Sequence, residues 1–579
     1  MPALRERIRR GTIKVSATAY PWTATRSWPR TSKMLLNIEV PSGECNYKLS
    51  SDNRMPGLRS TDTLPKPYTD NPSRNPALRQ RAGAETTGNS RENFLVGFAV
   101  LIHLLVAVPL AYSLNIWTDE AFTLDTTGKN LGYALSQSIH FEIQAPLYFL
   151  VLNLWQHINQ SIFFARLFSV ICVALTIVFI SILAKQLFRN IRPSWIAFWL
   201  AVHPFTIWAA TEIRLYAFAL LLASLLILLF FQGFRTDAQP RGYRLAYLVV
   251  AVAALYTHYY LGFILVANAF VLIVNRRWRS LGQYVLHMAL AGVCFVPMMS
   301  FVVAQGRSTM TADSHPLRLL TAFSRVIWQI KEFILPVAST DPQWLRRWIF
   351  RAAYFTVGIM VFRSGRRLLS RTNSGIYALV LVVSFFFVLA LRSVPEGFLI
   401  ERHMVSLFLP VVLLTSCLIN SAGRIWRPIA LSILIFFSAW SSYENFKSVA
   451  KEGDWQRVSS FLQMKENPDE TILVFHAGAA LPLSHYYHGV NRLVALPNGN
   501  RTDRFDLHDY VLHDEGEIRA AVGEQAGDTV WMVTDGKCGC AGVNFNCPLL
   551  EEFIQREFDV TTTVGFKNSL VRKLRRKSR

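Results

Sequence analysis

Acidic residues and arginines gather at the ends of long apolar stretches of the chain. Ionisable groups at membrane depth are costly and usually functional. A carboxylate there can take the proton of an attacking hydroxyl, and guanidinium groups can neutralise the charge of a phosphate leaving group. Transfer of a sugar from a lipid phosphate needs this combination. The acids are Asp119, Glu120, Glu142 and Glu212, and Arg166, Arg214, Tyr216, His258 and Arg402 lie at the same ends.

The apolar stretches themselves predict a polytopic membrane protein. The chain is 52% hydrophobic over 579 residues, which is too apolar for a soluble protein of several domains. Its apolar residues come in blocks that approach the ~20 residues a helix needs to cross a bilayer, and we expect about eleven spans. The blocks are Phe94–Tyr112, Leu167–Leu183, Trp195–Ala210, Tyr216–Phe231, Leu245–Tyr256, Gly262–Val274, Val285–Val303, Ala352–Phe362, Ile376–Leu391, Val405–Leu418 and Pro428–Trp440.

The distribution of charge predicts how these spans are oriented. The net charge is +22, but Lys and Arg cluster between every second pair of spans, for example at Arg276–Arg279 and Arg424–Arg427. A nucleic-acid-binding protein would gather its charge on one soluble domain, so we exclude nucleic acid as a partner. The alternation follows the positive-inside rule. It predicts a bacterial inner-membrane protein with a cytoplasmic N-terminus, and it places the acids and everything beyond Tyr443 outside.

Three regions follow from composition. Residues 1–91 are basic and rich in Pro and Ser, which predicts a disordered cytoplasmic tail. Residues 92–443 hold the spans, and 113–164 form the first outward loop with the acids. In that loop Ala145–His157 is apolar, but counting it as a span would invert all later loops, so we expect a helix along the outer leaflet. Phe323–Val337 has the pattern of a second surface helix.

Residues 444–579 mix strand and helix patterns and predict a small exported α/β domain. The expected fold class is therefore an all-α membrane domain with an extramembrane α/β domain at its C-terminal end. Strands are expected at Thr471–Phe475 and Val530–Thr534, and helices at Trp455–Met464 and Leu549–Phe558.

Three cysteines of the exported region predict a disulfide. Cys538, Cys540 and Cys547 lie close in sequence, and an oxidising compartment permits one bond with one thiol left over. A zinc site would need a fourth ligand that the spacing does not supply.

Five short motifs resemble those of one enzyme family. Trp117-Thr118-Asp119-Glu120-Ala121 resembles the W-x-D-E-A signature of the GT-C membrane glycosyltransferases, most closely that of the bacterial relatives of protein O-mannosyltransferases and of the aminoarabinose transferase that modifies lipid A. The other motifs are His140–Phe149, which is similar to D-x-H-P-P-L-Y-Y, Thr211–Ala217, which is similar to S-x-E-A-R-x-Y-A, and the counterparts Thr257–Tyr260 and Glu401–His403. They occur in order over about Phe94–Trp440, each on the expected outer face, and are specific together.

The resemblance implies an inverting transferase that uses a polyprenyl-phosphate sugar as donor. Its acceptor would be an envelope glycan, a lipid or a protein. Asp119 would be the catalytic base, and Glu120 and Glu142 would assist it or position the acceptor. The donor phosphate would be bound by Arg166, Arg214, Tyr216 and Arg402, with Glu212 and His258 as further candidates.

One departure from the family pattern leaves the metal question open. Gln144 and Ala145 stand where the family has His-Pro, so a divalent metal at this segment is neither predicted nor excluded. Glu142 still aligns with the family acid.

Several of these residues also have structural interpretations. Asp119 and Glu120 could cap a following helix, and Glu212 and Arg214 could pair with each other. Arg166 could extend its head group toward the interface, and His258 could be a packed histidine. The alternative function is a transporter or flippase for lipid-linked substrates, which would place ionisable residues at mid-membrane in broken helices. A sugar polymerase is a third.

Overall fold

The computed structural model describes residues 76–235, 240–308, 317–336, 344, 347–349, 351–352, 355–356, 371–393, 401–497, 505–523, 528–540 and 542–578. All the described residues belong to one compact unit. Most of the expected disordered tail, 1–91, lies outside the described residues.

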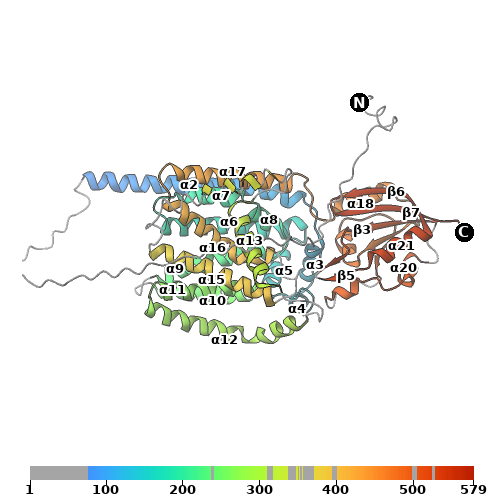
Figure 1. The fold of residues 1–579 in the computed structure, drawn as a ribbon, viewed down its shortest axis with the longest axis horizontal. Helices are drawn as coiled ribbons and strands as arrows, with labels where there is room; N and C mark the ends of the chain where they lie inside the picture. Colours follow the sequence, from blue (N-terminus) through green and yellow to red (C-terminus); the bar gives the residue numbers. More distant parts are fainter. Residues whose placement is uncertain are drawn as a thin grey trace, which may run out of the picture. The chain divides into compact units, whose positions relative to one another are not determined.

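Six helices of the described part are long and apolar enough to cross a membrane, so the protein is a multi-pass membrane protein. They pack side by side with shorter helices (Figure 1). The six are α2 (Pro76–Ser113), α6 (Ile162–Leu187), α9 (Tyr216–Phe234), α12 (Trp278–Ser308), α15 (Arg371–Ser393) and α16 (Val405–Ser421), and the shorter ones include α7 (Pro193–Val202), α8 (Pro204–Thr211), α10 (Arg241–Leu255), α11 (Gly262–Val274) and α13 (Leu319–Ile334). A further long helix, α17 (Trp426–Phe446), packs against α7. The total of about eleven spans stays a prediction, because Ala352–Phe362 falls largely outside the described residues.

Two helix boundaries differ from the expected ones. Helix α2 begins at Pro76, inside the stretch predicted to be disordered, and runs without a break into the first span. A helix that is already nucleated by a span extends more easily than an isolated one. The third expected span is two helices, α7 and α8. Pro204 lacks an N–H and disfavours helical backbone at His203, which is extended (ψ 132°), so the chain breaks there and α8 starts with Pro204 in its first turn.

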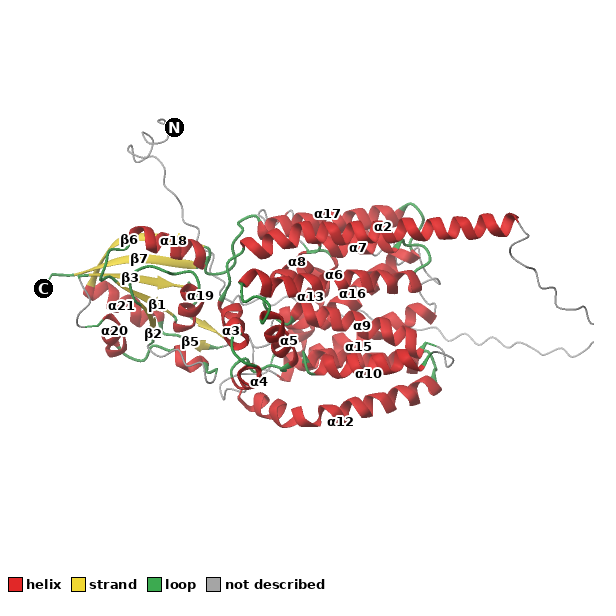
Figure 2. Cartoon of the chain, turned by 180° about the vertical axis from the view of Figure 1, so that it is seen from behind, coloured by secondary structure: helices red, strands yellow, loops and turns green. Residues whose placement is uncertain are grey.

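Three short helices fill the segment between α2 and α6: α3 (Thr118–Thr127), α4 (Leu131–His140) and α5 (Leu147–Gln156). They lie at one end of the long helices (Figure 2). Helix α5 coincides with the expected surface helix Ala145–His157, and α13 with the one expected at Phe323–Val337. The first loop is thus compact and presents α3 beside α19 (Ala480–Ser484) of the C-terminal region.

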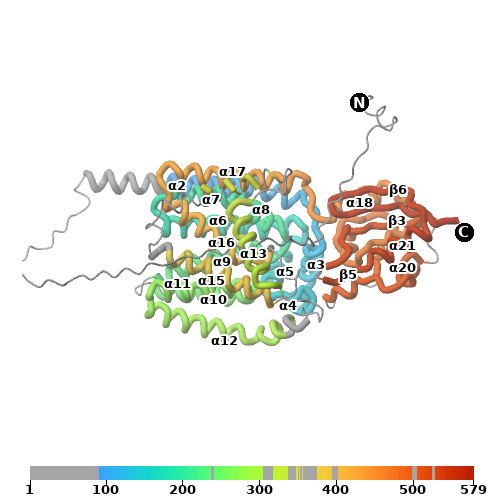
Figure 3. Tube along the Cα trace, viewed as in Figure 1, coloured from blue at the N-terminus to red at the C-terminus, as the bar shows by residue number. Residues whose placement is uncertain are grey.

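The C-terminal region is a mixed α/β domain, as expected (Figure 3). Its five-stranded sheet has the order β2-β1-β3-β7-β6, with β1 parallel to both β2 and β3. The strands are β1 (Thr471–Phe475), β2 (Leu493–Leu496), β3 (Thr529–Thr534), β6 (Phe558–Phe566) and β7 (Ser569–Arg576), and the helices are α18 (Trp455–Lys465), α19 (Ala480–Ser484), α20 (Glu515–Val522) and α21 (Cys547–Glu557).

Side chains that alternate along β1 build a core on each face of this sheet, as strand geometry requires. Ile472 packs with Trp455 of α18, whereas Leu473 packs with Ile518 of α20 and Phe553 of α21 on the opposite face. The sheet is therefore covered on both sides, and the ends of its strands are left to carry function.

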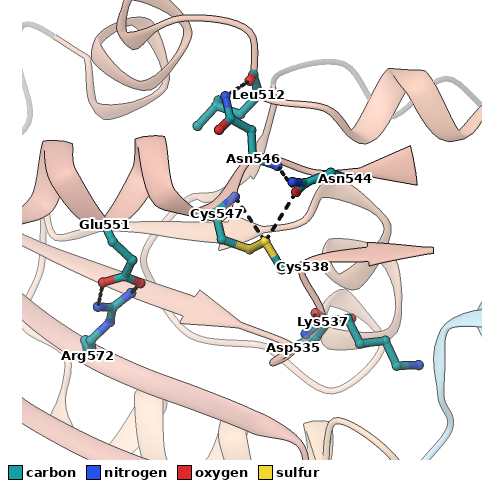
Figure 4. The surroundings of a disulfide bond; sticks show 9 residues. All are labelled: Leu512, Asp535, Lys537, Cys538, Asn544, Asn546, Cys547, Glu551 and Arg572. Atoms are coloured by element: carbon teal, nitrogen blue, oxygen red, sulfur yellow. Dashed lines mark hydrogen bonds and ion pairs between the residues drawn. A yellow bond between two sulfur atoms is a disulfide. The ribbon is translucent and has the colours of Figure 1, made fainter. Parts of the chain in front are cut away.

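The expected disulfide joins Cys538 and Cys547 and leaves Cys540 as the thiol (Figure 4). Cys538 also accepts the backbone N–H of Cys547 at 3.1 Å. The bond ties the loop after β3, which carries the short strands β4 (Gly539–Cys540) and β5 (Val543–Asn544), to the start of α21.

Candidate active site

The first turn of α3 points two acids in different directions, and Glu120 points inward. Its side chain is fully buried, 2.9 Å from Arg166 and 2.9 Å from Lys451. It also accepts the backbone N–H of Ile213 at 2.8 Å. Glu120 therefore joins α3, α6, the turn before α9 and the segment after α17.

Arg166 on α6 uses its whole guanidinium group within the protein. It donates to both carboxylate oxygens of Glu120 and to the backbone carbonyls of Ala111, Leu114 and Asn115. The side chain is fully buried, so the snorkelling interpretation is wrong. No N–H is left for a phosphate, and the geometry instead fits an arginine that holds the end of α2 and positions Glu120.

Lys451 is a site residue that the sequence analysis missed. Its ammonium lies 2.9 Å from Glu120 and 2.9 Å from Glu212, and it donates to the carbonyl of Thr211 at 2.8 Å. Glu212 also accepts the indole N–H of Trp117 at 2.6 Å. One buried cation thus bridges two acids that are far apart in the sequence.

The two acids that share Lys451 differ in pKa. Burial tends to raise the pKa of Glu120, but Arg166 and Lys451 together hold it below the ordinary value. Burial also raises the pKa of Glu212, which has Lys451 as its cation and the charge of Glu120 nearby, and there the net direction is upward. Glu120 is therefore the charged member that anchors the cluster, and Glu212 is the one that takes a proton more readily.

Glu142 and Arg214 form a second buried pair. Arg214 lies 2.6 Å from Glu142, donates to the hydroxyl of Thr123 at 2.7 Å and to the backbone carbonyl of Asp119 at 3.2 Å. Thr123 in turn donates to Glu142 at 3.1 Å. Burial raises the pKa of Glu142, although Arg214 opposes the shift. Arg214 and Glu212 each have another partner, so the proposed mutual pair is not what holds this turn.

Asp119 is the acid that remains accessible. Its carboxylate lies 2.9 Å from Arg402, and 25% of its side chain is exposed, against 4% for Glu142 and none for Glu120. The guanidinium of Arg402 also lies over the ring of Trp117, 4.9 Å from its centroid. Asp119 thus sits between two arginines, Arg402 at its carboxylate and Arg214 at its carbonyl.

Arg214, Arg402 and His258 each have a buried polar atom without a hydrogen-bond partner among the described residues. These atoms are Nε of Arg214, Nε of Arg402 and Nδ1 of His258. Tyr216 lies among them, with its ring centroid 6.5 Å from that of His258 and 6.4 Å from that of His403. Unsatisfied buried donors are rare in proteins and point to a group that binds there.

The sequence-predicted residues therefore converge at one end of the helices. The helix-capping interpretation holds in part, because Glu120 accepts the backbone N–H of Trp117 at 3.4 Å. His258 packs beside Tyr216, which fits the packed-histidine interpretation as well as a role at the site. Among the described residues, no three His, Cys, Asp or Glu side chains are grouped so that they could hold a metal ion.

Comparisons with known proteins support the fold. Residues 143–302 match the family model described as dolichyl-phosphate-mannose-protein mannosyltransferase, and a search of curated proteins gives no match. The structure of ArnT from Cupriavidus metallidurans in the apo state is similar at a TM-score of 0.52 and 11% identity, covering 84% of this chain and 98% of ArnT. The structure of the same protein bound to undecaprenyl phosphate is similar at a TM-score of 0.50 and 11% identity, covering 83% of this chain and 97% of ArnT. The chain therefore has the GT-C fold, and its likeness to the bacterial relatives of protein O-mannosyltransferases and of the aminoarabinose transferase is confirmed.

Proposed function

We propose that this protein is an inverting glycosyltransferase that moves a sugar from a polyprenyl phosphate to an acceptor at the outer face of the bacterial inner membrane. The family model that matches part of the chain names a dolichyl-phosphate-mannose-dependent enzyme, and the ArnT structure with the same fold holds undecaprenyl phosphate. Both donors are polyprenyl phosphates. The observation that carries the proposal is the place of Asp119, a partly exposed carboxylate between two arginines.

Asp119 is the acid placed to act as general base. A base must reach the hydroxyl that it deprotonates, and Glu120, Glu142 and Glu212 are buried and already paired. The acceptor oxygen attacks the anomeric carbon, its proton passes to Asp119, and the bond from that carbon to the phosphate oxygen breaks. The electron pair of that bond leaves with the polyprenyl phosphate, and the configuration at the anomeric carbon inverts.

Arg214 and Arg402 are placed to neutralise the leaving phosphate. Each keeps a buried Nε–H without a partner among the described residues, and hydrogen bonds between guanidinium and phosphate are strong. Arg402 also holds Asp119, so a phosphate that draws Arg402 toward itself would release the carboxylate for the acceptor. Arg166 and Lys451 act behind these groups and position the acids.

The side of the membrane on which the site lies is inferred from the distribution of basic residues. Arginine clusters at the opposite ends of the helices fit the cytoplasmic side under the positive-inside rule. The disulfide between Cys538 and Cys547 fits an exported C-terminal domain.

The test compares Asp119→Asn with the wild type in membranes supplied with radiolabelled polyprenyl-phosphate hexoses and pentoses. General-base catalysis contributes about 10²–10⁴-fold, so transfer should fall by about that factor. Asp125→Asn is the matched control, because Asp125 lies on the same helix with a similar exposure of 30% and pairs with Lys129. We expect near wild-type transfer for this control.

Equal transfer by Asp119→Asn and the wild type would remove Asp119 from the mechanism. Translocation of the labelled lipid without transfer to any acceptor would favour the transporter interpretation. Transfer is read by separating the labelled lipid from the labelled product, and translocation is read by the accessibility of the labelled lipid to a reagent added on one side of the membrane.

A further inference from the structure

The sheet of the C-terminal domain has a topological switch point. The chain leaves β1 for β2 on one side and then passes to β3 on the other, and all three strands are parallel. In open α/β sheets, ligands bind outside the carboxyl ends of the strands at such a point. In this sheet, that point lies at the carboxyl ends of β1 and β3.

A buried histidine and a buried aspartate occupy these two strand ends. His476 directly follows β1 and Asp535 directly follows β3, and Nε2 of His476 lies 2.9 Å from Oδ2 of Asp535. The other carboxylate oxygen accepts the backbone N–H of Lys537 at 2.9 Å, and the backbone N–H of Asp535 donates to the carbonyl of Phe475 at 3.3 Å. The pair is thus fixed by the sheet and by the loop that the disulfide ties.

The second nitrogen of His476 leaves its hydrogen-bonding capacity unused. Nδ1 is buried and has no hydrogen-bond partner among the described residues, in a side chain that is about nine-tenths buried. Because the aspartate accepts at Nε2, the neutral ring carries its proton there and keeps a lone pair on Nδ1. A lone pair fixed in this way accepts a hydrogen bond from an O–H group.

Aromatic rings surround this position and lead toward the membrane domain. The centroid of the His476 ring lies 5.3 Å from that of Tyr510 and 4.9 Å from that of Phe545. Phe505 continues the row at 6.3 Å from Tyr510 and meets Phe141 of the first loop at 6.1 Å. Tyr510 and Phe545 belong to the buried core of the domain, so they hold the His476 ring in a fixed orientation at the edge of the sheet.

The charges nearby are balanced. Lys537 pairs with Glu452 at 2.7 Å, and Arg402 pairs with Asp119 at 2.9 Å. Burial lowers the pKa of Lys537, but Glu452, Asp535 and Asp119 more than offset it, so the pKa is raised. The backbone carbonyl of Glu452 also accepts the side-chain N–H of Asn115 at 3.3 Å, and Phe505 meets Phe141, so this edge of the domain lies beside segments that adjoin the candidate active site. Lys537, the cation of this edge, is already paired with Glu452, so the edge favours a neutral, hydroxyl-bearing ligand over an anion.

We propose that the carboxyl edge of β1 and β3 binds a neutral sugar unit of a glycan acceptor, through His476 and the exposed side chain of Lys537, and so brings an acceptor hydroxyl to Asp119. This inference rests on the proposed function and adds the acceptor class to it. Lys537 extends away from the Cys538–Cys547 bond (Figure 4) and is about half exposed, so it can donate to a sugar hydroxyl.

Binding is measured with the full-length protein in nanodiscs by saturation-transfer NMR. The probes are neutral trisaccharides of mannose and of arabinose, with a trisaccharide of galacturonic acid as the charged comparison. The wild type should give signals with at least one neutral probe. His476→Phe, which keeps a ring between Tyr510 and Phe545, should lose them, and the surface variant Lys537→Gln should weaken them severalfold. His513→Gln, an exposed histidine of the same domain, should leave them unchanged.

Kinetics separate acceptor binding from chemistry. With the best neutral probe as acceptor, His476→Phe should raise the acceptor KM at least tenfold, while kcat and the slow hydrolysis of the donor by water stay within twofold. Lys537→Gln should change the same constant and no other. A merely structural role of His476 would lower kcat and donor hydrolysis together.

The two proposals fail in different ways. Asp119→Asn should bind the neutral probe normally and transfer sugar about 10²–10⁴-fold more slowly than the wild type. Neutral-probe signals that depend on His476 without any transfer by the wild type would overturn the transferase and keep the sugar site. Transfer with an unchanged acceptor KM in both His476→Phe and Lys537→Gln would overturn the sugar site alone. Preferential binding of the galacturonic probe, or label found only in protein, would also overturn it.

Discussion

Replacing Lys451 by methionine removes the cation shared by two buried acids. In the wild type, the ammonium lies 2.9 Å from both Glu120 and Glu212. The variant leaves Glu120 with Arg166 but leaves Glu212 without a cation. Removing one partner of a buried ion pair costs about 3–5 kcal/mol of stability. We expect a loss near the lower end, because Glu212 still accepts the indole N–H of Trp117.

The loss should depend on pH in a defined direction. Burial raises the pKa of Glu212 in the wild type, and without Lys451 the pKa in the folded state should rise further. A carboxyl whose pKa is higher in the folded than in the unfolded state destabilises the fold above the unfolded pKa, and the penalty disappears as the pH falls. The deficit of Lys451→Met should therefore be about 3 kcal/mol near pH 8 and should shrink toward pH 5.

Thermal unfolding followed by tryptophan fluorescence in detergent, between pH 5 and pH 8, measures this deficit. The double variant Lys451→Met/Glu212→Gln removes both charges and should recover most of the loss. Lys447→Met is the control, since this lysine pairs with Glu444 on the surface, and it should leave the unfolding temperature unchanged. A deficit of equal size at both pH values, or a double variant as unstable as the single one, would refute the reasoning.

Three further predictions concern other parts of the molecule. Arg166→Lys keeps the charge but not the five hydrogen bonds, so the yield of folded protein in size-exclusion chromatography should fall sharply, whereas the donor KM of the folded fraction should stay near wild type. Arg214→Lys should raise the KM for labelled polyprenyl-phosphate sugar about tenfold, because one charge-assisted hydrogen bond is worth about 1.5 kcal/mol; an unchanged donor KM would contradict the phosphate role. Cys538→Ser with Cys547→Ser should cost roughly 2–3 kcal/mol for a loop of this length, measured by thermal unfolding, while Cys540→Ser should cost nothing.

Patterns of hydrophobicity and charge predicted the elements of this fold well. The strand Thr471–Phe475 was predicted with its observed bounds, and helices were predicted where α5 and α13 lie, although their place along the membrane surface stays a prediction. The break between α7 and α8 was missed, although Pro204 within an expected span was its signal. Such features are local, so the sequence carries them directly.

Contacts between side chains that are distant in the sequence could not be predicted in the same way. Asp119, Glu142 and Arg214 were found because each lies in a motif at a predicted helix end. Lys451 carries no such motif, and its partner Glu120 lies on a helix at the other end of the chain. His476 was missed for the same reason, because its contact with Asp535 depends on the strand order that places β1 beside β3.

The bridge made by Lys451 has a consequence for biosynthesis. The lysine follows α17, so it is translated after all the helices that carry the acids and arginines. A chain still emerging from the ribosome holds Glu120 and Glu212 without their shared cation, and a protein truncated after α17 stays in that condition. The buried cluster around Glu120 and Glu212 is thus completed last, which makes the isolated helical part a poor substitute for the whole protein.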